Sequence, residues 1–207
     1  MKLKNSELAV IFDIGGVLID WNPRYLYRKL FTDQAAMETF LTEVCSPEWN
    51  SKQDAGRPFS EAISELIIQY PEQESLIRAW FDRWPEMIGG AIESTVEVLS
   101  ELKERGYQLF ALSNWSAETF PYARERFDFL KWFNEIVVSG EVKLIKPDRR
   151  IYDLFLKKTG WEASQCLFID DSESNISVAK QLGFQAIYFQ SAELLRVDLH
   201  QMGFLSY

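Results

Sequence analysis

Residues 8–20, LAVIFDIGGVLID, decide the fold of this chain. The apolar run of residues 8–12 ends in Asp13, and Gly15 and Gly16 follow it closely. A short apolar run that ends at glycine is typical of a strand buried on both faces. Asp13 would then lie at the carboxyl edge of a parallel sheet, where open α/β folds bind their ligands. An aspartate at this position can also cap a turn, so the stretch alone leaves its role open.

The composition of the chain excludes several classes of function. With 207 residues, 47% of them hydrophobic, the chain is long enough for one well-buried domain, with or without an inserted subdomain. A net charge of −9 argues against nucleic acid or an anionic membrane as the main partner. We find no signal-peptide pattern and no transmembrane segment, and therefore expect a cytoplasmic protein. The single histidine, His200, argues against a mechanism with a histidine base.

Residues 21–85 differ in character from the rest of the chain. They are rich in aromatic side chains and show apolar residues at helical spacing, for example Phe59, Ile63 and Leu66. Glycines and prolines divide the segment into short pieces. We therefore predict a helical cap at residues 21–85, with the core domain formed by residues 1–20 and 86–207. Trp80 and Trp84 are expected to pack inside the cap.

After residue 85, strand and helix patterns alternate. Strands are expected at 107–112, 135–138, 165–169 and 185–189, with helices around 92–102, 151–155 and 176–182. Strands that alternate with helices predict a parallel sheet covered by helices on both faces, which is an α/β fold.

Three of the predicted strands end in polar residues. These are Asp13, Ser113 with Asn114, and Asp170 with Asp171. In a doubly wound sheet such ends meet at one edge, beside the point where the strand order reverses. Lys146, in the loop 141–147, is a cation that can reach the same edge. Each residue alone can belong to a turn or a helix start, but together they predict one site.

The chain resembles the haloacid dehalogenase superfamily of hydrolases. Four segments carry the resemblance, in the family's order and across nearly the whole chain: FDIGGVL at 12–18, LSN at 112–114, KP at 146–147, and DD at 170–171 with Asn175. The helical insertion after the first strand is similar to the family's first cap class. The resemblance implies a Rossmann-like core with an inserted α-helical cap subdomain. Within the family, the chain is most similar to small cytosolic sugar-phosphate phosphatases.

The resemblance also implies a catalytic centre around Asp13. Asp13 would be the nucleophile and would form an aspartyl-phosphate. Mg²⁺ would be the cofactor, held by Asp13, Asp171 and the backbone carbonyl of Gly15. These hard oxygen ligands suit Mg²⁺, and the metal with Lys146 would offset the charge of a phosphate dianion.

Further roles follow from the same resemblance. Asp170 and Asn175 would orient the metal ligands and Lys146. Ser113 would give its hydroxyl to the phosphate oxygens, and the amides from Asn114 onward would form a cradle for them. The substrate would be a small phosphorylated metabolite, and the sequence does not predict the oligomeric state.

Substrate choice is expected to lie with the cap and the loop after Ser113. The candidates are Trp21, Asn22, Arg24, Trp49, Arg57 and Trp115. Trp49 and Arg57 could stack on and pair with a sugar phosphate, but both could equally pack within the cap. Trp115 should lie within reach of a leaving group, or else serve packing.

The chain departs from the family pattern at Gly15. Most phosphatases of the family carry a second aspartate here, two residues after the nucleophile, as general acid and base. Glycine can offer its carbonyl to Mg²⁺ but cannot carry a proton. Loss of a general acid typically costs about 10²–10⁴ in rate. Phosphates with leaving groups of low pKa would be affected least.

Two other functions remain open. A 2-haloacid dehalogenase expels halide without a proton donor or metal, but such enzymes usually carry an aromatic residue at the position of Gly15 and a less acidic fourth motif. A non-catalytic binding or regulatory protein is the other alternative. The retained charges of Asp13, Lys146 and Asp171 argue against it, because such a cluster is costly to keep without a function.

Overall fold

Five parallel strands form the sheet at the centre of the core domain in the computed structural model, which describes residues 5–206. They are β1 (Ala9–Phe12), β4 (Gln108–Ser113), β5 (Glu135–Val138), β6 (Cys166–Asp170) and β7 (Gln185–Tyr188), in the order β5-β4-β1-β6-β7. The strand order reverses beside β1, because β4 and β6 flank it on opposite sides and both pair with it in parallel. The ends of β1, β4 and β6 therefore meet at one edge.

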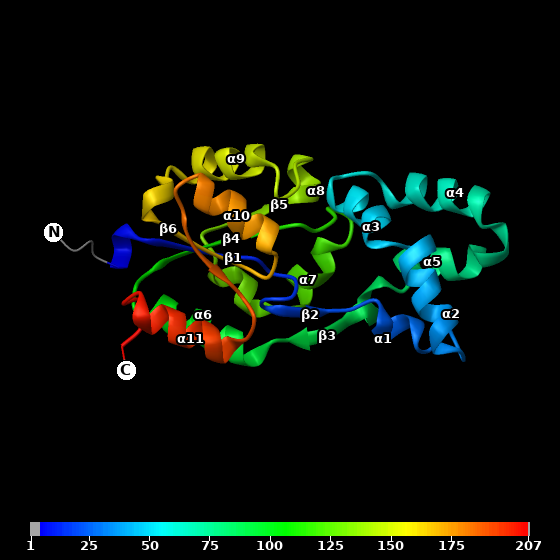
Figure 1. Ribbon diagram of the computed structural model, residues 1–207, viewed down its shortest axis with the longest axis horizontal. Helices are drawn as coiled ribbons and strands as arrows, with labels where there is room; N and C mark the ends of the chain where they lie inside the picture. Colours follow the sequence, from blue (N-terminus) through cyan, green and yellow to red (C-terminus); the bar gives the residue numbers. More distant parts are fainter. Residues whose placement is uncertain (1–4, 207) are drawn as a thin grey trace.

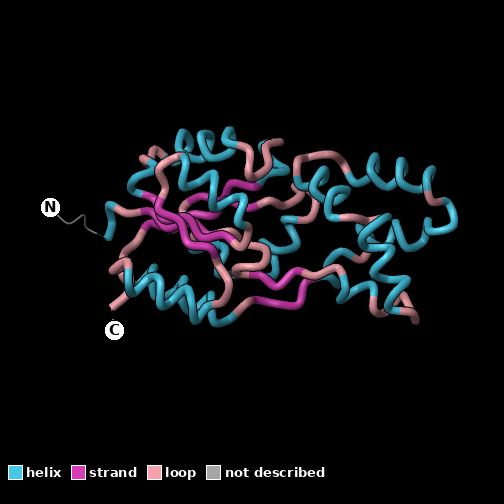
Figure 2. The backbone as a smooth tube through the Cα atoms, in the orientation of Figure 1, coloured by secondary structure: helices cyan, strands magenta, loops and turns pink. Residues whose placement is uncertain are grey.

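Alternate residues of β1 belong to two hydrophobic clusters, one on each face of the sheet. Val10 and Phe12 belong to one hydrophobic cluster, whereas Ala9 and Ile11 belong to the other, and all four are fully buried. The first layer holds α6 (Glu93–Glu104), α7 (Phe120–Arg126) and α11 (Ala192–Gln201), and the second holds α9 (Arg149–Thr159) and α10 (Glu173–Gln181). Figure 2 shows these helices above and below the strands. The predicted α/β fold is confirmed.

The cap lies at one end of the molecule, beyond the carboxyl edge of the sheet (Figure 1). Its helices are α1 (Arg24–Tyr27), α2 (Gln34–Thr39) with a π-helical turn at Phe40–Val44, α3 (Pro47–Asp54), α4 (Phe59–Gln69) and α5 (Glu74–Asp82). Trp80 is 1% exposed, and its ring contacts those of Trp49, Tyr27 and Trp21. Trp80 therefore packs inside the cap, as predicted. The same prediction for Trp84 is wrong, because its ring packs against those of Trp115 and Tyr122 in the core.

Two short strands that the sequence analysis missed connect the cap to the core. β2 (Ile19–Trp21) and β3 (Ile88–Ala91) pair antiparallel at the two ends of the insertion. Neither shows a recognisable strand pattern, since β2 has three residues and β3 contains two adjacent glycines. Also missed were α7, α11 and the single turn of α8 (Ser139–Val142). None of the helices in residues 5–206 has the length and apolar character of a membrane span.

Candidate active site

Asp13 lies at the carboxyl end of β1 and is held by groups from both neighbouring strands. Its Oδ1 accepts hydrogen bonds from the Ser113 hydroxyl at 2.6 Å and from the backbone N–H of Ile14 at 2.7 Å. Its Oδ2 lies 2.9 Å from Nζ of Lys146. Only 7% of Asp13 is exposed, so the carboxylate is fixed and largely withdrawn from water.

Lys146 connects the ends of three strands. Its buried ammonium group contacts Asp13, donates to Oδ2 of Asp170 at 2.6 Å, and donates to the backbone carbonyl of Leu112 at 2.8 Å. All three N–H donors of the ammonium thus have partners. Burial alone would lower the pKa of Lys146, but the charges of Asp13 and Asp170 raise it above its usual value, so the side chain stays cationic.

Asn114 positions Lys146 through the backbone. Its Nδ2 donates to the carbonyl of Lys146 at 3.0 Å, and its Oδ1 accepts the N–H of Lys146 at 2.8 Å. Asn114 also lines the cavity described below. The structure therefore gives this residue a positioning contact, and its predicted contact with phosphate stays a prediction.

Asp170 is fully buried, and both of its oxygens are occupied. Oδ1 accepts from the N–H of Ser172 at 2.8 Å, and Asn175 Nδ2 lies 2.9 Å and 3.1 Å from the two oxygens. Oδ2 also accepts from Lys146. With every oxygen engaged by protein donors, Asp170 is suited to fixing Lys146 in place.

Asp171 projects beside the Gly16 backbone. Gly16 has a φ of 75°, and a Cβ at this position would lie 2.2 Å from Oδ2 of Asp171. Only glycine leaves room for the carboxylate here. Asp13, Asp170 and Asp171 each offer an oxygen within 4.8 Å of the others. Such a set of carboxylates fits Mg²⁺, which prefers hard oxygen ligands and few of them from protein.

Burial alters the pKa of the predicted nucleophile. It is the main cause that raises the pKa of Asp13 to about 7; the charges of Asp170 and Asp171 contribute to this increase, whereas Lys146 and the Ser113 hydroxyl oppose it. A cation among these carboxylates would favour the ionised form that a nucleophile requires.

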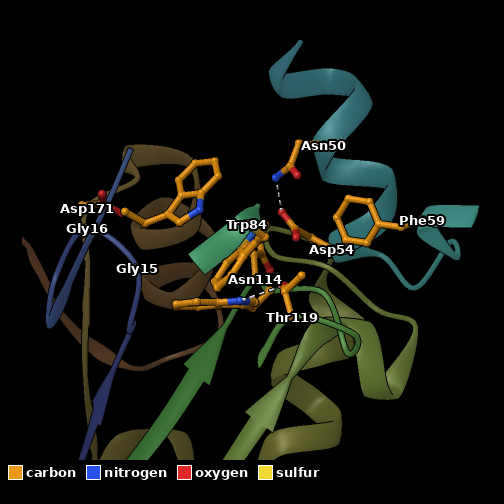
Figure 3. Close-up of a pocket in the computed structure, with 11 residues that line it drawn as sticks. Gly15, Gly16, Asn50, Asp54, Phe59, Trp84, Asn114, Thr119 and Asp171 are labelled. Atoms are coloured by element: carbon orange, nitrogen blue, oxygen red, sulfur yellow. Dashed lines mark hydrogen bonds between the residues drawn. The ribbon is translucent and has the colours of Figure 1, made fainter. Parts of the chain in front are cut away.

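A cavity of about 220 Å³ opens over this edge, between the core and the cap (Figure 3). The core lines it with Gly15, Gly16, Asn114, Trp115, Thr119 and Asp171, and the cap with its connecting segments adds Trp21, Asn50, Asp54, Phe59 and Trp84. The ring of Trp115 lies 5.5 Å from that of Trp84, and its Nε1 donates to Thr119 Oγ1 at 3.1 Å. Aromatic rings thus form much of the wall above the carboxylates.

The family model for haloacid dehalogenase-like hydrolases matches residues 10–189. The chain belongs to this family. The sesquiterpene phosphatase AstK of Aspergillus oryzae is 26% identical over 94% of this chain and 95% of its own length. A phosphorylated carbohydrates phosphatase of Thermotoga maritima is 27% identical over 87% of this chain and 83% of its own length.

Solved structures share the fold of this family member. A haloacid dehalogenase family enzyme of Bacteroides thetaiotaomicron, crystallised as a mutant with magnesium and inorganic phosphate, has a TM-score of 0.68 and 22% identity, covering 89% of this chain and 94% of its own. An L-2-haloacid dehalogenase of Xanthobacter autotrophicus has a TM-score of 0.62 and 16% identity, covering 95% and 84%. Both likenesses concern the fold alone.

Two predicted substrate contacts lie elsewhere in this haloacid dehalogenase-like hydrolase. Trp49 and Arg57 line a separate hollow on the cap and not the cavity above Asp13. Arg57 Nε donates to Gln53 at 2.8 Å, and Nη1 pairs with Glu65 at 2.9 Å. The structure therefore does not bring Trp49 and Arg57 together with Asp13, because neighbouring cap residues engage them. Trp21 and Trp115, by contrast, do line the cavity.

Asp54, Asn50 and Phe59 were missed as cavity residues of this family member. Cations and aromatic residues suit a phosphate ester, so an acid such as Asp54 was not among the expected contacts, and the helical spacing of Phe59 indicated packing within the cap. The glycine at position 15 was the available signal. A site without its usual proton carrier invites a search for another carboxyl group in the cap.

Proposed function

We propose that the protein is a magnesium-dependent phosphatase that transfers the phosphoryl group of a small phosphorylated metabolite to Asp13 and then to water. One observation carries the proposal. Three carboxylates, Asp13, Asp170 and Asp171, converge within 4.8 Å around a single buried lysine. Halide displacement requires no metal, so it does not explain three carboxylates at one site. A bound metal ion would offset the charges of these carboxylates and of a phosphate dianion.

The proposed metal ligands are Asp13, Asp171 and the backbone carbonyl of Gly15. Hydrogen bonds already occupy both oxygens of Asp170, which supports a role for Asp170 in orienting Lys146. When bound, Mg²⁺ would neutralise charge on the phosphate and keep Asp13 ionised.

Asp13, Lys146 and Ser113 would each have a separate role in the reaction. Asp13 attacks phosphorus from a position fixed by Ser113 and Ile14. Lys146, kept cationic by its two carboxylate partners, stabilises the charge on the phosphate oxygens as the bond to the leaving group breaks. The Ser113 hydroxyl, which donates to Asp13 at 2.6 Å, would turn to the oxygens of the incoming phosphate.

The prediction of a phosphoric monoester hydrolase is confirmed at the level of the family and its phosphatase relatives. The names of those relatives cover a sesquiterpene and phosphorylated carbohydrates, so they support a phosphate ester without selecting one metabolite. The aromatic cavity wall suits either class, since indole rings pack against alkyl chains and against sugar rings.

The test is hydrolysis of para-nitrophenyl phosphate with Mg²⁺ and with EDTA, alongside halide release from 2-chloropropionate. We expect phosphate release that requires Mg²⁺ and no halide release. Halide release that persists in EDTA, without phosphate release, would assign the protein to the dehalogenases instead. Inactivity on both compounds and on a panel of sugar and alkyl phosphates would favour a non-catalytic protein.

A further inference from the structure

Asp54 is the last residue of α3 and faces the predicted active site from the cap. In Figure 3, Asp54 and Asn50 come from the cap helix, across the cavity from the loop that carries Gly15. The Asp54 carboxylate accepts hydrogen bonds from Nδ2 of Asn50 at 3.0 Å and from the backbone N–H of Ser116. Its orientation is thus fixed from both the cap and the core.

The Asp54 backbone is anchored where the cap meets the core. The Ser139 hydroxyl donates to the Asp54 carbonyl at 2.5 Å and also accepts the backbone N–H of Trp115 at 2.9 Å. Phe59, at the start of the next cap helix, donates its N–H to Glu118 Oε1 at 2.7 Å. These bonds hold the end of α3 and the start of α4 against Ser139 and the loop after β4, and thereby keep Asp54 at the cavity wall.

Among the described residues that line the cavity, two have ionisable side chains, Asp54 and Asp171. Asp171 lies among the proposed metal ligands, beside Gly16. Gly15 has no side chain to carry a proton. Within the described part of the chain, Asp54 is therefore the one carboxyl group in the cavity wall that has no other assignment.

We propose that Asp54 is the general acid and base of the reaction, supplied by the cap in place of a side chain at Gly15. This assignment rests on the phosphatase function proposed above. In the first step, Asp13 forms a bond to phosphorus, the bond to the leaving oxygen breaks, and the Asp54 carboxyl proton passes to that oxygen. An alcohol leaves, and Asp54 becomes a carboxylate.

The second step restores both aspartates. The Asp54 carboxylate takes a proton from a water molecule while the water oxygen attacks phosphorus. The bond between phosphorus and Asp13 breaks, which releases inorganic phosphate and regenerates the Asp13 carboxylate and the protonated Asp54. Because the cap supplies Asp54, both steps require the seated cap, and the reaction is thereby coupled to exclusion of water.

The surroundings of Asp54 suit a group that both gives and takes a proton. Burial is the main cause that raises the pKa of Asp54 to about 7; the charge of Asp13 contributes to this increase, whereas the Ser116 N–H opposes it. The other group on its own helix that contacts it, Asn50, is neutral. A general acid works best when its pKa lies near the working pH.

The test is Asp54→Asn, measured as kcat/KM over a series of phosphate esters whose leaving groups span a wide range of pKa. Asparagine keeps the shape and the bond from Ser116 but carries no transferable proton. We expect little change for para-nitrophenyl phosphate, because nitrophenolate leaves without protonation. For alkyl phosphates we expect a loss of about 10²–10⁴-fold, the usual contribution of a general acid.

Two further readouts separate proton transfer from a role in substrate binding. Asp54→Asn should release a burst of nitrophenol equal to the enzyme concentration, because hydrolysis of the phosphorylated Asp13 becomes slow. In the wild-type enzyme, kcat/KM for alkyl phosphates should fall above about pH 7 as Asp54 loses its proton, and Asp54→Asn should lack this fall. Glu48→Gln, an exposed carboxyl group on the same helix, is the matched control and should behave as wild type.

An equal loss of kcat/KM for every ester, with no burst and an unchanged pH profile, would overturn the assignment and leave Asp54 as a substrate contact. Asp54→Glu, which keeps a carboxyl group, should retain the leaving-group dependence of the wild type if Asp54 transfers a proton. Absence of Mg²⁺-dependent phosphate release by the wild-type protein is a different result, since it contradicts the phosphatase proposal on which this assignment rests.

Discussion

Nζ of Lys146 lies 2.9 Å from Oδ2 of Asp13, and neither group has substantial contact with water. The same ammonium also lies 2.6 Å from Asp170, so one buried cation faces two carboxylates. Burying an excess of charge of one sign costs free energy that the fold does not recover through packing. The excess negative charge therefore favours a site that binds a metal cation, and with it a phosphate group, during the reaction.

The first prediction concerns the nucleophile. Asp13→Asn should reduce turnover by at least about 10⁴-fold, the scale seen when an enzyme loses its nucleophile, because an amide cannot attack phosphorus. Folding should survive, since asparagine fits the same space and can still accept from Ser113. The measurement is phosphate release, with thermal unfolding recorded beside it, and Asp128→Asn on the exposed surface serves as the control. Retained turnover in carefully purified Asp13→Asn protein would contradict the mechanism.

The second prediction uses two adjacent glycines with different surroundings. Gly16→Ala places a Cβ 2.2 Å from Oδ2 of Asp171, so the carboxylate must move away from the other metal ligands. The positive φ adds a cost of about 1–2 kcal/mol to folding. In Gly15→Ala the new Cβ meets only Trp115, at 3.9 Å, and the backbone carbonyl stays. We expect Gly16→Ala to lose Mg²⁺ binding and Gly15→Ala to keep it.

The readout for these variants is stabilisation by Mg²⁺ in thermal unfolding, which does not depend on activity. A metal present at about 100 times its Kd stabilises the folded state by about 2.7 kcal/mol. Wild type and Gly15→Ala should both show this increase, whereas Gly16→Ala and Asp171→Ala should show little of it. Equal stabilisation of all four proteins would exclude Asp171 as a ligand.

The core and its catalytic edge could be predicted from sequence because their signals are local. The apolar run before Asp13 and the similar runs before Ser113 and Asp170 each end in a polar residue. Parallel strands bring their carboxyl ends to one edge, so the convergence of these residues followed from topology. The registers of β1 with β4 and β6 place these ends side by side.

The cap residues could not be chosen in the same way. Glu48, Asp54 and Glu61 all lie in helical segments of the cap, and nothing local distinguishes the one that enters the cavity. The choice depends on how α3 meets Ser116 and Ser139, which lie more than 60 positions further along the chain. The environment of Arg57 likewise depends on Glu65 in the following helix, so its charge predicted a substrate contact that the structure does not place at the site.

A third prediction tests the contact between Asn114 and the Lys146 backbone. Asn114→Ala removes two hydrogen bonds that position Lys146. We expect unfolding free energy to fall by about 1–3 kcal/mol, since buried backbone groups lose their partners. We also expect kcat to fall about 10–100-fold, as is usual for residues that orient a catalytic centre, with little change in KM.

The control for Asn114→Ala is Asn134→Ala, which breaks an exposed amide pair with Gln108 and should leave kcat unchanged. A large increase in KM and in the inhibition constant of inorganic phosphate, with kcat preserved, would favour direct phosphate binding by Asn114. Such a result would rule out the positioning role as its main contribution.

The fourth prediction concerns stability and pH in the metal-free protein. Folding raises the pKa of Asp54 from 3.8 to about 7, mainly through burial. Between these values the folded state holds a proton on Asp54 that the unfolded state has released. Unfolding free energy therefore falls as pH rises from about 4 to 7, by at most about 1.4 kcal/mol per pH unit for this group. Other residues also titrate in this range, so the informative quantity is the difference between wild type and Asp54→Asn.

The difference in unfolding free energy between wild type and Asp54→Asn should change in one direction only. Because asparagine does not titrate, the stability of the wild type relative to Asp54→Asn should be highest near pH 4 and should decline until about pH 7. Above the folded pKa it should level off, since both states of the wild type are then ionised at this position. Denaturant unfolding at a series of pH values in EDTA measures this difference in stability, with Glu48→Gln as the control. A difference that stays constant, or that grows with pH, would mean that Asp54 is ionised in the folded protein throughout, and such a carboxylate has no proton to give at neutral pH.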